Sequence, residues 1–595
     1  MPNSGGLVGN GFYVMKKILF SCLIALISSV TALAYDYMVD DIYYNITGTN
    51  TVEVTYKDTN YDSYWDYNIT IPSTITRGSK TYRVTAIGEY AFRGSSHYIS
   101  LTLPEGLTTI GTGAFYESYY MSLPNLPSSL TTIGNLAFYG ASIANVNIPD
   151  NVTSIGDMAF ANISYGLTIT LGNGVTKIPD MAFYQTKFSD GYFIIPNSVT
   201  EIGASAFQET DLSEIYFGAK VSRVGQMAFA GCSNLKRIFC KSTVPPTLPD
   251  NPNAPGGFES SIYSTANLWV PDGAVNAYRA ANYWRNFSSV GVGFRTEFCG
   301  DVDGNGHVTI SDVTRLINML LSGSPIVNGL TDVNGDGSVN INDVTRLINQ
   351  LLSGDFGPQT FYLMGVPFTM IPVQGGTFTM GATEEQGTDA TNYEKPAHQV
   401  TLSSYSIGQT ELTCEQWLLL MDSNDIDSYS DIKEPAMVAS YLDIAPYLAK
   451  LSAITDLHFK LPTEAQWEFA ARGGNKSLGF KYAGSDDVNA VAWYYGNSSN
   501  DYTYYPVASK RPNELGLYDM SGNAAEWCED WAMSYPSTPQ IDPVSPVEDP
   551  SPTHSESRIL RGGSVKTDAI KCRVSARDYF VQYAYLNYGS FRLVR

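Results

Sequence analysis

Basic side chains are scarce in this chain of 595 residues, which has 36 Lys and Arg against 58 Asp and Glu and a formal net charge of −22. A surface with this excess of negative charge repels phosphate backbones and anionic lipids, so the composition argues against nucleic-acid binding. Charged residues make up only 16% of the chain, while hydrophobic residues reach 44% and tyrosines number 41. These proportions argue against a disordered chain and predict several β-rich globular domains.

Long hydrophobic runs are missing beyond the first 34 residues. Lys16 and Lys17 precede the apolar run 18–27, which leads to the small-residue pattern 32–34. This order predicts a signal peptide over 15–34, with Met15 as the start and Tyr35 as the first mature residue. No other stretch approaches the roughly 18 apolar residues that a membrane-spanning helix needs. We therefore expect an exported protein, secreted or associated with the cell surface, without a membrane span.

Cysteine and histidine are also few. After cleavage of the signal peptide six cysteines remain, without the compact spacing of a disulfide-rich domain, so we expect most to be buried free thiols. The five histidines stand singly and never at the spacing of zinc ligands. Nothing in the sequence therefore supports a zinc hydrolase.

A short unit recurs seven times between residues 84 and 240. Each copy has an apolar residue followed by Gly or Pro, then Ala-Phe four residues later, as in Ile110-Gly111 and Ala114-Phe115. The phenylalanines lie 23, 23, 22, 23, 24 and 22 residues apart, at Phe92, Phe115, Phe138, Phe160, Phe183, Phe207 and Phe229. A period this regular predicts a solenoid in which each coil buries its apolar face against its neighbours.

These repeats resemble the leucine-rich repeats of the BspA-like type, found in bacterial surface proteins that adhere to host components or other bacteria. The resemblance implies an N-terminal β cap over 35–83, repeats over 84–240 and a C-terminal cap over 241–298. We expect Ile, Ala and Phe to form the core. Protein or glycan ligands would then contact exposed strand positions, where tyrosine offers a flat ring with a polar tip.

Two segments between 299 and 355 have oxygen ligands at the spacing of a calcium loop. Calcium takes six to eight hard oxygens, supplied by loop positions 1, 3, 5 and 12 and a backbone carbonyl at 7, with glycine at 6 for a sharp turn. The first loop has Asp301, Asp303, Asn305, Gly306, His307 and Asp312 at these positions. The second has Asp332, Asn334, Asp336, Gly337, Ser338 and Asp343. The sequence therefore predicts two EF-hand-like loops, each binding one Ca²⁺.

Each loop is followed by a helical pattern, with apolar residues at offsets 0, 3, 4 and 7 starting from Val313 and from Val344. A loop followed by one helix, twice, resembles a type I dockerin over 299–355. That family docks onto cohesins through residues near loop positions 10 and 11, here Ile310-Ser311 and Ile341-Asn342 rather than the frequent Ser-Thr pair. A cohesin partner is one interpretation. The other is a calcium-stiffened spacer between two larger modules.

Residues 365–595 have a series of motifs in a fixed order. They include Leu461-Pro462-Thr463-Glu464-Ala465-Gln466-Trp467-Glu468-Phe469, Gly522-Asn523-Ala524-Ala525-Glu526-Trp527, Arg561-Gly562-Gly563-Ser564 and a closing Gly589-Ser590-Phe591-Arg592. These closely resemble the formylglycine-generating enzyme (sulfatase-modifying factor) family, which implies a C-type-lectin-like fold. The fold class expected for the whole chain is thus multidomain: a β-rich leucine-rich-repeat solenoid, a small all-α dockerin-like calcium module and an α+β lectin-like domain.

Active members of that family use two cysteines five residues apart to bind copper(I) and oxidise a substrate cysteine. Cys572 matches the second of these, but Thr567 stands at the first position. Copper(I) prefers soft thiolate ligands, and one thiolate does not make that site. Cys414 and Cys528 are the other cysteines of this region, and we expect both to serve packing. If the domain is active at all, Cys572 is the candidate catalytic residue.

The family also has structural calcium, and Glu526 with carbonyls near Gly522 and Ala524 matches one of its sites. Glu526 fits equally well as a buried carboxylate paired with Arg561 or Arg592, so both interpretations stand. Our leading hypothesis is an exported, non-catalytic interaction protein. The alternatives are an oxidase acting on sulfatase cysteine and a cohesin-docked component of a polysaccharide-degrading complex.

Overall fold

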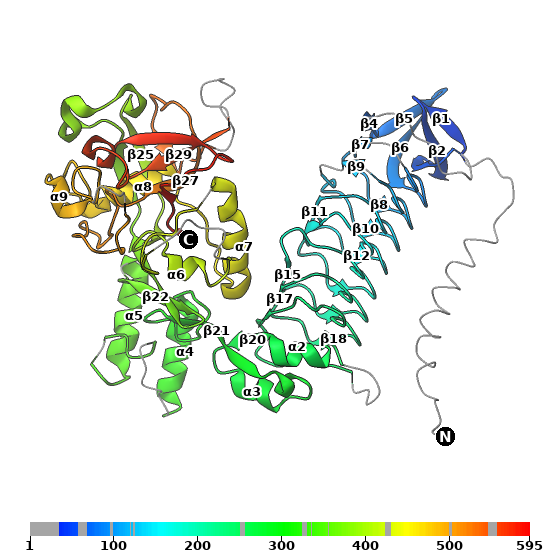
Figure 1. The fold of residues 1–595 in the computed structure, drawn as a ribbon, viewed down its shortest axis with the longest axis horizontal. Helices are drawn as coiled ribbons and strands as arrows, with labels where there is room; N and C mark the ends of the chain where they lie inside the picture. Colours follow the sequence, from blue (N-terminus) through cyan, green and yellow to red (C-terminus); the bar gives the residue numbers. More distant parts are fainter. Residues whose placement is uncertain are drawn as a thin grey trace.

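The computed structural model describes residues 35–57, 68–95, 99–119, 121–122, 125–249, 256–323, 330–334, 336–354, 356–422, 430–438, 440–498, 503–545 and 556–595. The predicted signal peptide, His97 and His554 lie outside the described residues. The structure consists mainly of strands with few helices (Figure 1). Within the described residues, no helix combines the length and the apolar character needed to cross a membrane.

The N-terminal part is a cap followed by a solenoid with two parallel ladders. Antiparallel strands β1 (Tyr37–Val39), β2 (Ile42–Gly48) and β3 (Thr51–Thr55), with β5 (Thr74–Arg77) beside β6 (Lys80–Ile87), form the cap. One ladder comprises β6, β8 (Thr109–Ile110), β10 (Thr132–Ile133) and β12 (Ser154–Ile155), which pair in one sheet, followed by β14 (Lys177–Ile178), β16 (Glu201–Ile202) and β18 (Arg223–Val224), which pair in a second sheet. The other comprises three paired groups: β4 (Asn68–Thr70), β7 (Ile99–Thr102) and β9 (Met121–Ser122); β11 (Asn145–Asn147) and β13 (Thr168–Thr170); and β15 (Tyr192–Ile194), β17 (Glu214–Phe217) and β19 (Arg237–Cys240).

The repeat phenylalanines form a continuous internal stack, as predicted. Successive rings from Phe92 to Phe229 lie 5.0–5.7 Å apart between centroids, with interplanar angles of 15° or less, and every ring is at most 2% exposed. Each coil therefore buries its ring against the coils before and after it. The stack ends at Phe258, which Trp284 and Phe287 contact edge-on. The C-terminal cap also contains α2 (Ser260–Thr265), β20 (Asn267–Pro271), α3 (Val275–Ala280) and η1 (Trp284–Asn286).

One sheet continues from the solenoid into the C-terminal domain. Its strand order is β15, β17, β19, β20, β21 (Ser289–Glu297), β22 (Gln359–Leu363), β23 (Val366–Val373) and β26 (Tyr405–Gly408). β21 and β22 pair antiparallel, with Glu297 opposite Thr360. The segment 298–358 therefore connects two adjacent strands, and the chain leaves and re-enters the sheet at the same end of this pair. The interpretation of this segment as a spacer is wrong, because its two neighbours contact each other directly.

The described part of residues 298–358 contains two helices, which lie beside β22 at the lower left of Figure 1. α4 (Ile310–Leu321) and α5 (Ile341–Ser353) each begin with a capping box, at Thr309 and Asn340. Both helices bury the first two positions of the predicted apolar pattern in a small core of their own. The third positions, Ile317 and Ile348, instead point outward and are 37% and 38% exposed.

The C-terminal domain combines short helices with small sheets. Its remaining strands are β24 (Gly376–Met380), β25 (His398–Leu402), β27 (Ala525–Trp531), β28 (Gln540–Ile541), β29 (Ser557–Arg561), β30 (Arg577–Val581) and β31 (Gly589–Ser590). Its helices are η2 (Glu384–Asp389), η3 (Asn392–Glu394), α6 (Cys414–Trp417), η5 (Tyr441–Asp443), α7 (Ile444–Thr455), α8 (Glu464–Ala471), η6 (Gly474–Lys476), α9 (Val488–Val491) and η7 (Ala569–Cys572).

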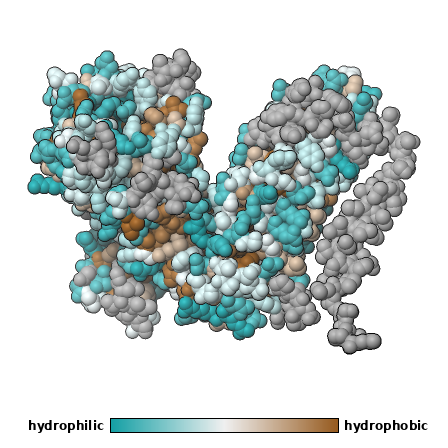
Figure 2. Space-filling model, in the orientation of Figure 1, coloured by the Kyte–Doolittle hydropathy of each residue, from teal (hydrophilic) through white to brown (hydrophobic). Residues whose placement is uncertain are grey.

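Helix α7 packs against the solenoid strands β17 and β19. Tyr216 and Phe239, which point out of the solenoid, share a buried cluster with Tyr447 and Leu451. In Figure 2 a hollow separates the N-terminal coils from the C-terminal domain, and the two parts meet lower down. The C-terminal domain therefore covers the outer face of the ladder that contains β17 and β19, and it does so only at the last coils.

A buried group of charges crosses this contact. Glu214 of β17 pairs with Arg237 of β19 and, at 3.2 Å, with Lys450 of α7, and it accepts a hydrogen bond from Tyr216. Lys450 also donates to the Leu420 carbonyl at 2.9 Å. Burial lowers the pKa of Lys450. The carboxylate of Glu214 thus compensates two cations that would otherwise be poorly solvated.

Replacing Glu214 by alanine leaves both cations without their shared anion. Removing one partner of a buried ion pair costs about 3–5 kcal/mol. We therefore expect Glu214→Ala to lower the midpoint of urea unfolding markedly, as followed by tryptophan fluorescence. Glu201→Ala is the matched control, because Glu201 also lies between two bases, Lys177 at 3.2 Å and Arg223 at 3.5 Å, but at the surface. Its expected cost is below about 1 kcal/mol. Equal shifts for the two variants would contradict the interpretation.

Candidate calcium loops and the Cys572 region

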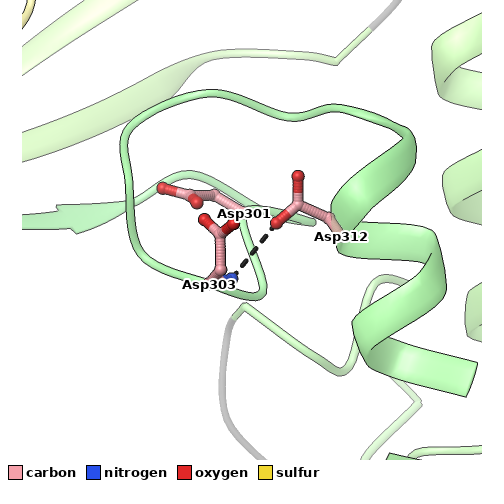
Figure 3. A group of neighbouring side chains, drawn as sticks. All are labelled: Asp301, Asp303 and Asp312. Atoms are coloured by element: carbon pink, nitrogen blue, oxygen red, sulfur yellow. Dashed lines mark hydrogen bonds between the residues drawn. The ribbon is translucent and has the colours of Figure 1, made fainter. Parts of the chain in front are cut away.

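The first predicted loop brings its acidic side chains together. One carboxylate oxygen from each of Asp301, Asp303 and Asp312 lies within 4.8 Å of the other two (Figure 3). The side chain of Asn305, also a predicted ligand, accepts a hydrogen bond from the backbone N–H of His307 at 2.8 Å. These are hard oxygen donors around one point, which is the ligand type that Ca²⁺ prefers. The residues present therefore fit a calcium ion.

Backbone hydrogen bonds hold both loops in the same shape. Asp301 accepts from the N–H groups of Asn305 at 3.0 Å and Gly306 at 2.8 Å. Asp332 of the second loop accepts from Asp336 at 3.1 Å and Gly337 at 2.8 Å.

The aspartates at position 12 of the two loops also accept matching hydrogen bonds. Asp312 accepts from Asp303 at 3.1 Å and Thr309 at 2.8 Å, and Asp343 accepts from Asn334 at 3.1 Å and Asn340 at 2.8 Å. The two loops thus share this pattern of hydrogen bonds, although the second is described without residue 335. Among the described residues, only the first loop brings three acidic side chains within 4.8 Å of one another.

The surroundings of the two first aspartates differ. Asp301 is fully buried and accepts a hydrogen bond from Thr296 of β21 at 2.9 Å. Burial raises its pKa to about 6, which marks an anion that lacks full solvation. Asp332 is only half-buried. A bound cation would therefore relieve a larger electrostatic cost in the first loop than in the second.

Cys572 lies in the interior, away from the other cysteines of its domain. Its side chain is fully buried beside Tyr482, Val491 and Ala492, whereas Cys414 and Cys528 belong to two other core clusters. Burial raises the pKa of Cys572 to about 12, against a smaller opposing effect of a hydrogen bond with Thr567. The sulfur is therefore a neutral thiol near pH 7, with a hydroxyl where a second thiolate is needed.

Buried arginine–glutamate pairs link the sequence motifs of this domain, and Glu526 belongs to one of these pairs. Arg592 donates to both carboxylate oxygens of Glu526 at 2.6 Å, and Trp467 donates to one of them at 2.8 Å. The structure thus shows the pairing of Glu526 with Arg592, which is one of its two interpretations. Arg561 instead pairs with Glu468.

The other two residues of that predicted calcium site make backbone contacts. The N–H of Gly522 donates to the Gly562 carbonyl at 2.8 Å, and the N–H of Ala524 donates to Glu411 at 2.7 Å. Glu411 is fully buried, and burial raises its pKa well above the ordinary value. Sequence spacing did not predict the contact between Glu411 and Ala524, because Glu411 lies more than 100 residues before Ala524.

Family comparisons assign the three parts of the chain. The Sulfatase-modifying factor enzyme 1-like domain matches residues 366–595, the BspA type leucine-rich repeat region matches 85–193 and 167–246, and the Dockerin type I domain matches 299–352. Type I dockerins generally bind calcium, and a cohesin is their possible partner. Dockerin and BspA-like domains are typical of extracellular or surface proteins.

Curated relatives match part of the chain. Chaperone protein LppX of Paenibacillus barcinonensis is 30% identical over 219 residues, covering 29% of this chain and 74% of LppX. The formylglycine-generating enzyme of Streptomyces coelicolor is 37% identical over 136 residues, covering 20% of this chain and 41% of the enzyme. The serine/threonine-protein kinase Pkn1 of Chlamydia trachomatis is 28% identical, and the match covers 34% of each chain. The chain thus spans less than half the length of the last two.

Among solved structures, Treponema denticola variable protein 1 is 26% identical and is covered to 98%, with 40% of this chain aligned at a TM-score of 0.34. A leucine-rich cell surface protein from Faecalibacterium prausnitzii is 25% identical and is covered to 74%, with 44% of this chain aligned at a TM-score of 0.32. Through residues 366–595 the chain belongs to the sulfatase-modifying factor enzyme 1-like family, and it carries a BspA-type leucine-rich repeat region and a type I dockerin domain ahead of that part.

Proposed function

We propose that this protein is exported by the signal peptide over 15–34 and acts, secreted or at the cell surface, as a non-catalytic interaction protein. The observation that carries the proposal is the pair Thr567 and Cys572, which offers one buried neutral thiol where copper(I) chemistry requires two thiolates. All three parts of the chain are compatible with binding. For residues 365–595 we further propose the C-type-lectin-like architecture, in keeping with the short helices and small sheets found there.

The competing function is an oxidase of the formylglycine-generating type that acts on a sulfatase cysteine. It requires the domain to bind copper(I), so metal binding separates the two proposals. We expect the wild-type protein to bind no stoichiometric copper(I) in an anaerobic titration against a chromophoric chelator. Thr567→Cys places a second sulfur beside Cys572 and should gain one strongly bound ion, while Thr567→Ser serves as control. Stoichiometric copper in the wild type, lost in Cys572→Ser, would contradict a non-catalytic role.

The proposed contact surface is the outer face of strands β4, β7, β11 and β13 in the N-terminal coils, which the C-terminal domain leaves uncovered. Outward side chains on this face are polar and exposed, at Asn68, Thr70, Thr102, Asn145, Asn147 and Thr170. Thr170 donates to the Asn147 amide oxygen at 2.6 Å across neighbouring strands. Rows of amide and hydroxyl groups can pair with the polar groups of a protein or glycan ligand. Tyr216 and Phe239, at equivalent positions of the last coils, are already covered.

Placing a long cation on this face should block a ligand there. We expect Asn147→Arg to reduce binding of the labelled mature protein to arrays of extracellular proteins and glycans at least tenfold. Asn173→Arg is the matched control, because Asn173 is also exposed but lies in the turn after β13 rather than on the strand face. Equal binding by both variants would exclude this face as the contact surface.

The calcium module is proposed to bind two ions. The first loop would use Asp301, Asp303, Asn305, Asp312 and the His307 carbonyl, and the second Asp332, Asn334, Asp336, Asp343 and the Ser338 carbonyl. Calcium would compensate the charge of the aspartates, which converge in the first loop, and would thereby order the loops and the helices that follow. Residues 299–355 would then form an all-helical module of the dockerin type around the small core shared by α4 and α5.

A cohesin partner is the second candidate function, and one observation favours it. The two helices expose the same apolar positions to nearly the same extent: Ile310 and Ile341 are 71% and 66% exposed, and Leu321 and Leu352 are both 81% exposed. Apolar side chains repeated in this way and left without cover are typical of an interaction surface. This protein would then be one component of a cohesin-based polysaccharide-degrading complex.

Cohesin binding should depend on calcium and on both copies of this surface. We expect recombinant type I cohesins to bind the full chain in calcium and to dissociate in chelator, as measured by biolayer interferometry. The double variant Ile310→Asp, Ile341→Asp should lose binding, while Thr314→Asp, Thr345→Asp, on exposed helix positions nearby, should retain it. Failure of a broad panel of cohesins to bind the wild type would remove this candidate.

A further inference from the structure

The two proposed calcium loops share the backbone hydrogen bonds to their aspartates but have different neighbours. In the first loop the Gly306 carbonyl, at position 6, accepts a hydrogen bond from Arg595 at 2.9 Å. A Cβ atom on Gly306 would lie 2.8 Å from a methyl of Leu457, so that side chain packs directly on the turn. Gly337, at position 6 of the second loop, is exposed and has no atom within 4 Å of the equivalent point. Among the described residues, only the first turn shows this cover from the C-terminal domain.

The contacts on the first loop come from well-anchored residues. Arg595 also donates to the Gln359 side chain of β22 at 3.0 Å, and its guanidinium lies 4.6 Å from the centre of the Phe298 ring. Leu457 is buried in the core that joins the solenoid to the C-terminal domain. Asp456, next to it in the chain, pairs with Lys241 and accepts from Asn197 at 2.8 Å, both of the solenoid part. The first loop is thus packed against the junction of all three parts.

We propose that Arg595 and Leu457 are positioning residues for the first calcium loop, so that Ca²⁺ in this loop and its docking on the C-terminal domain stabilise each other. The second loop binds Ca²⁺ independently of that domain. This inference rests on the calcium binding proposed above. Position 6 is the sharp turn that sets the direction of the ligands at positions 5 and 7, so fixing its carbonyl lowers the cost of forming the site. Coupling of this kind acts equally in both directions.

The charge of Arg595 makes the prediction discriminating. A guanidinium near the loop repels a divalent cation, so removal of the charge alone would strengthen calcium binding. Loss of positioning would weaken it. The two effects have opposite signs, and the sign of the change in affinity therefore reports which one dominates.

The test is a calorimetric titration of the full chain with Ca²⁺ alone. Asp332→Asn isolates the first loop and Asp301→Asn isolates the second. In these backgrounds we expect Arg595→Ala to weaken the first loop about tenfold, the loss typical of a removed outer-shell contact, and to leave the second loop unchanged. Leu457→Ala, which changes no charge, should have the same selective effect. First-loop affinity that is unchanged or stronger in these variants, or equal losses at both loops, would overturn the proposal.

Hydrogen exchange measures the coupling in the other direction. In the Asp332→Asn protein, calcium should slow amide exchange in the segment 456–460, and in Asp301→Asn it should not. Equal exchange with and without calcium, in a protein whose first loop is saturated, would overturn the coupling while leaving the proposed calcium binding intact. A wild-type titration without any bound calcium would refute both. The two failures are therefore distinguishable.

Discussion

The antiparallel pairing of β21 with β22 is the constraint on which the arrangement of the whole chain depends. Through it, strands that belong to the last coils of the solenoid and strands of the C-terminal domain form one hydrogen-bonded sheet. Backbone hydrogen bonds across a sheet fix both the spacing and the direction of neighbouring strands. The C-terminal domain is therefore held against the solenoid at a defined orientation, and helix α7 covers Tyr216 and Phe239 as a result.

The buried ions at the junction depend on this orientation. Glu214 lies opposite Lys450 only because the sheet brings α7 above β17. A buried carboxylate with two cations contributes more to the choice of one arrangement than to net stability, since desolvation offsets much of the attraction. The apolar contacts supply the driving force, and the charges penalise alternative positions of the helix that would leave them unpaired.

The sequence predicted contacts between residues that are close in the chain or one repeat apart. It missed contacts between residues more than 200 positions apart. The period of the Ala-Phe unit is enough to predict the stacked rings, because each ring contacts the same position one coil away. The matching hydrogen bonds of the two loops follow from spacing for a similar reason, since all the predicted ligands of each loop lie within 12 residues. Lys450 and Glu214 are 236 residues apart, and no local pattern connects them. The same holds for Arg595, whose partner Gly306 lies 289 residues earlier.

Two features could be predicted only in part, because the residue types alone allowed more than one arrangement. Glu526 had two interpretations from the sequence, and its pairing with Arg592 depends on a residue 66 positions away, just after β31. The helical period placed Ile317 and Ile348 on the apolar face, but a module this small buries a narrower stripe than the pattern suggests. Proteins with little interior volume cannot cover every apolar residue.

The pairing of Glu297 with Thr360 has a consequence for how such a chain can be assembled. Residues directly opposite each other in an antiparallel pair are about 4.5–5.5 Å apart between Cα atoms, a gap that a tight turn spans. The helical module thus occupies the position of a hairpin loop. A segment in this position can be lengthened, shortened or replaced while the two larger parts keep their mutual register, because neither the entry nor the exit strand has to move.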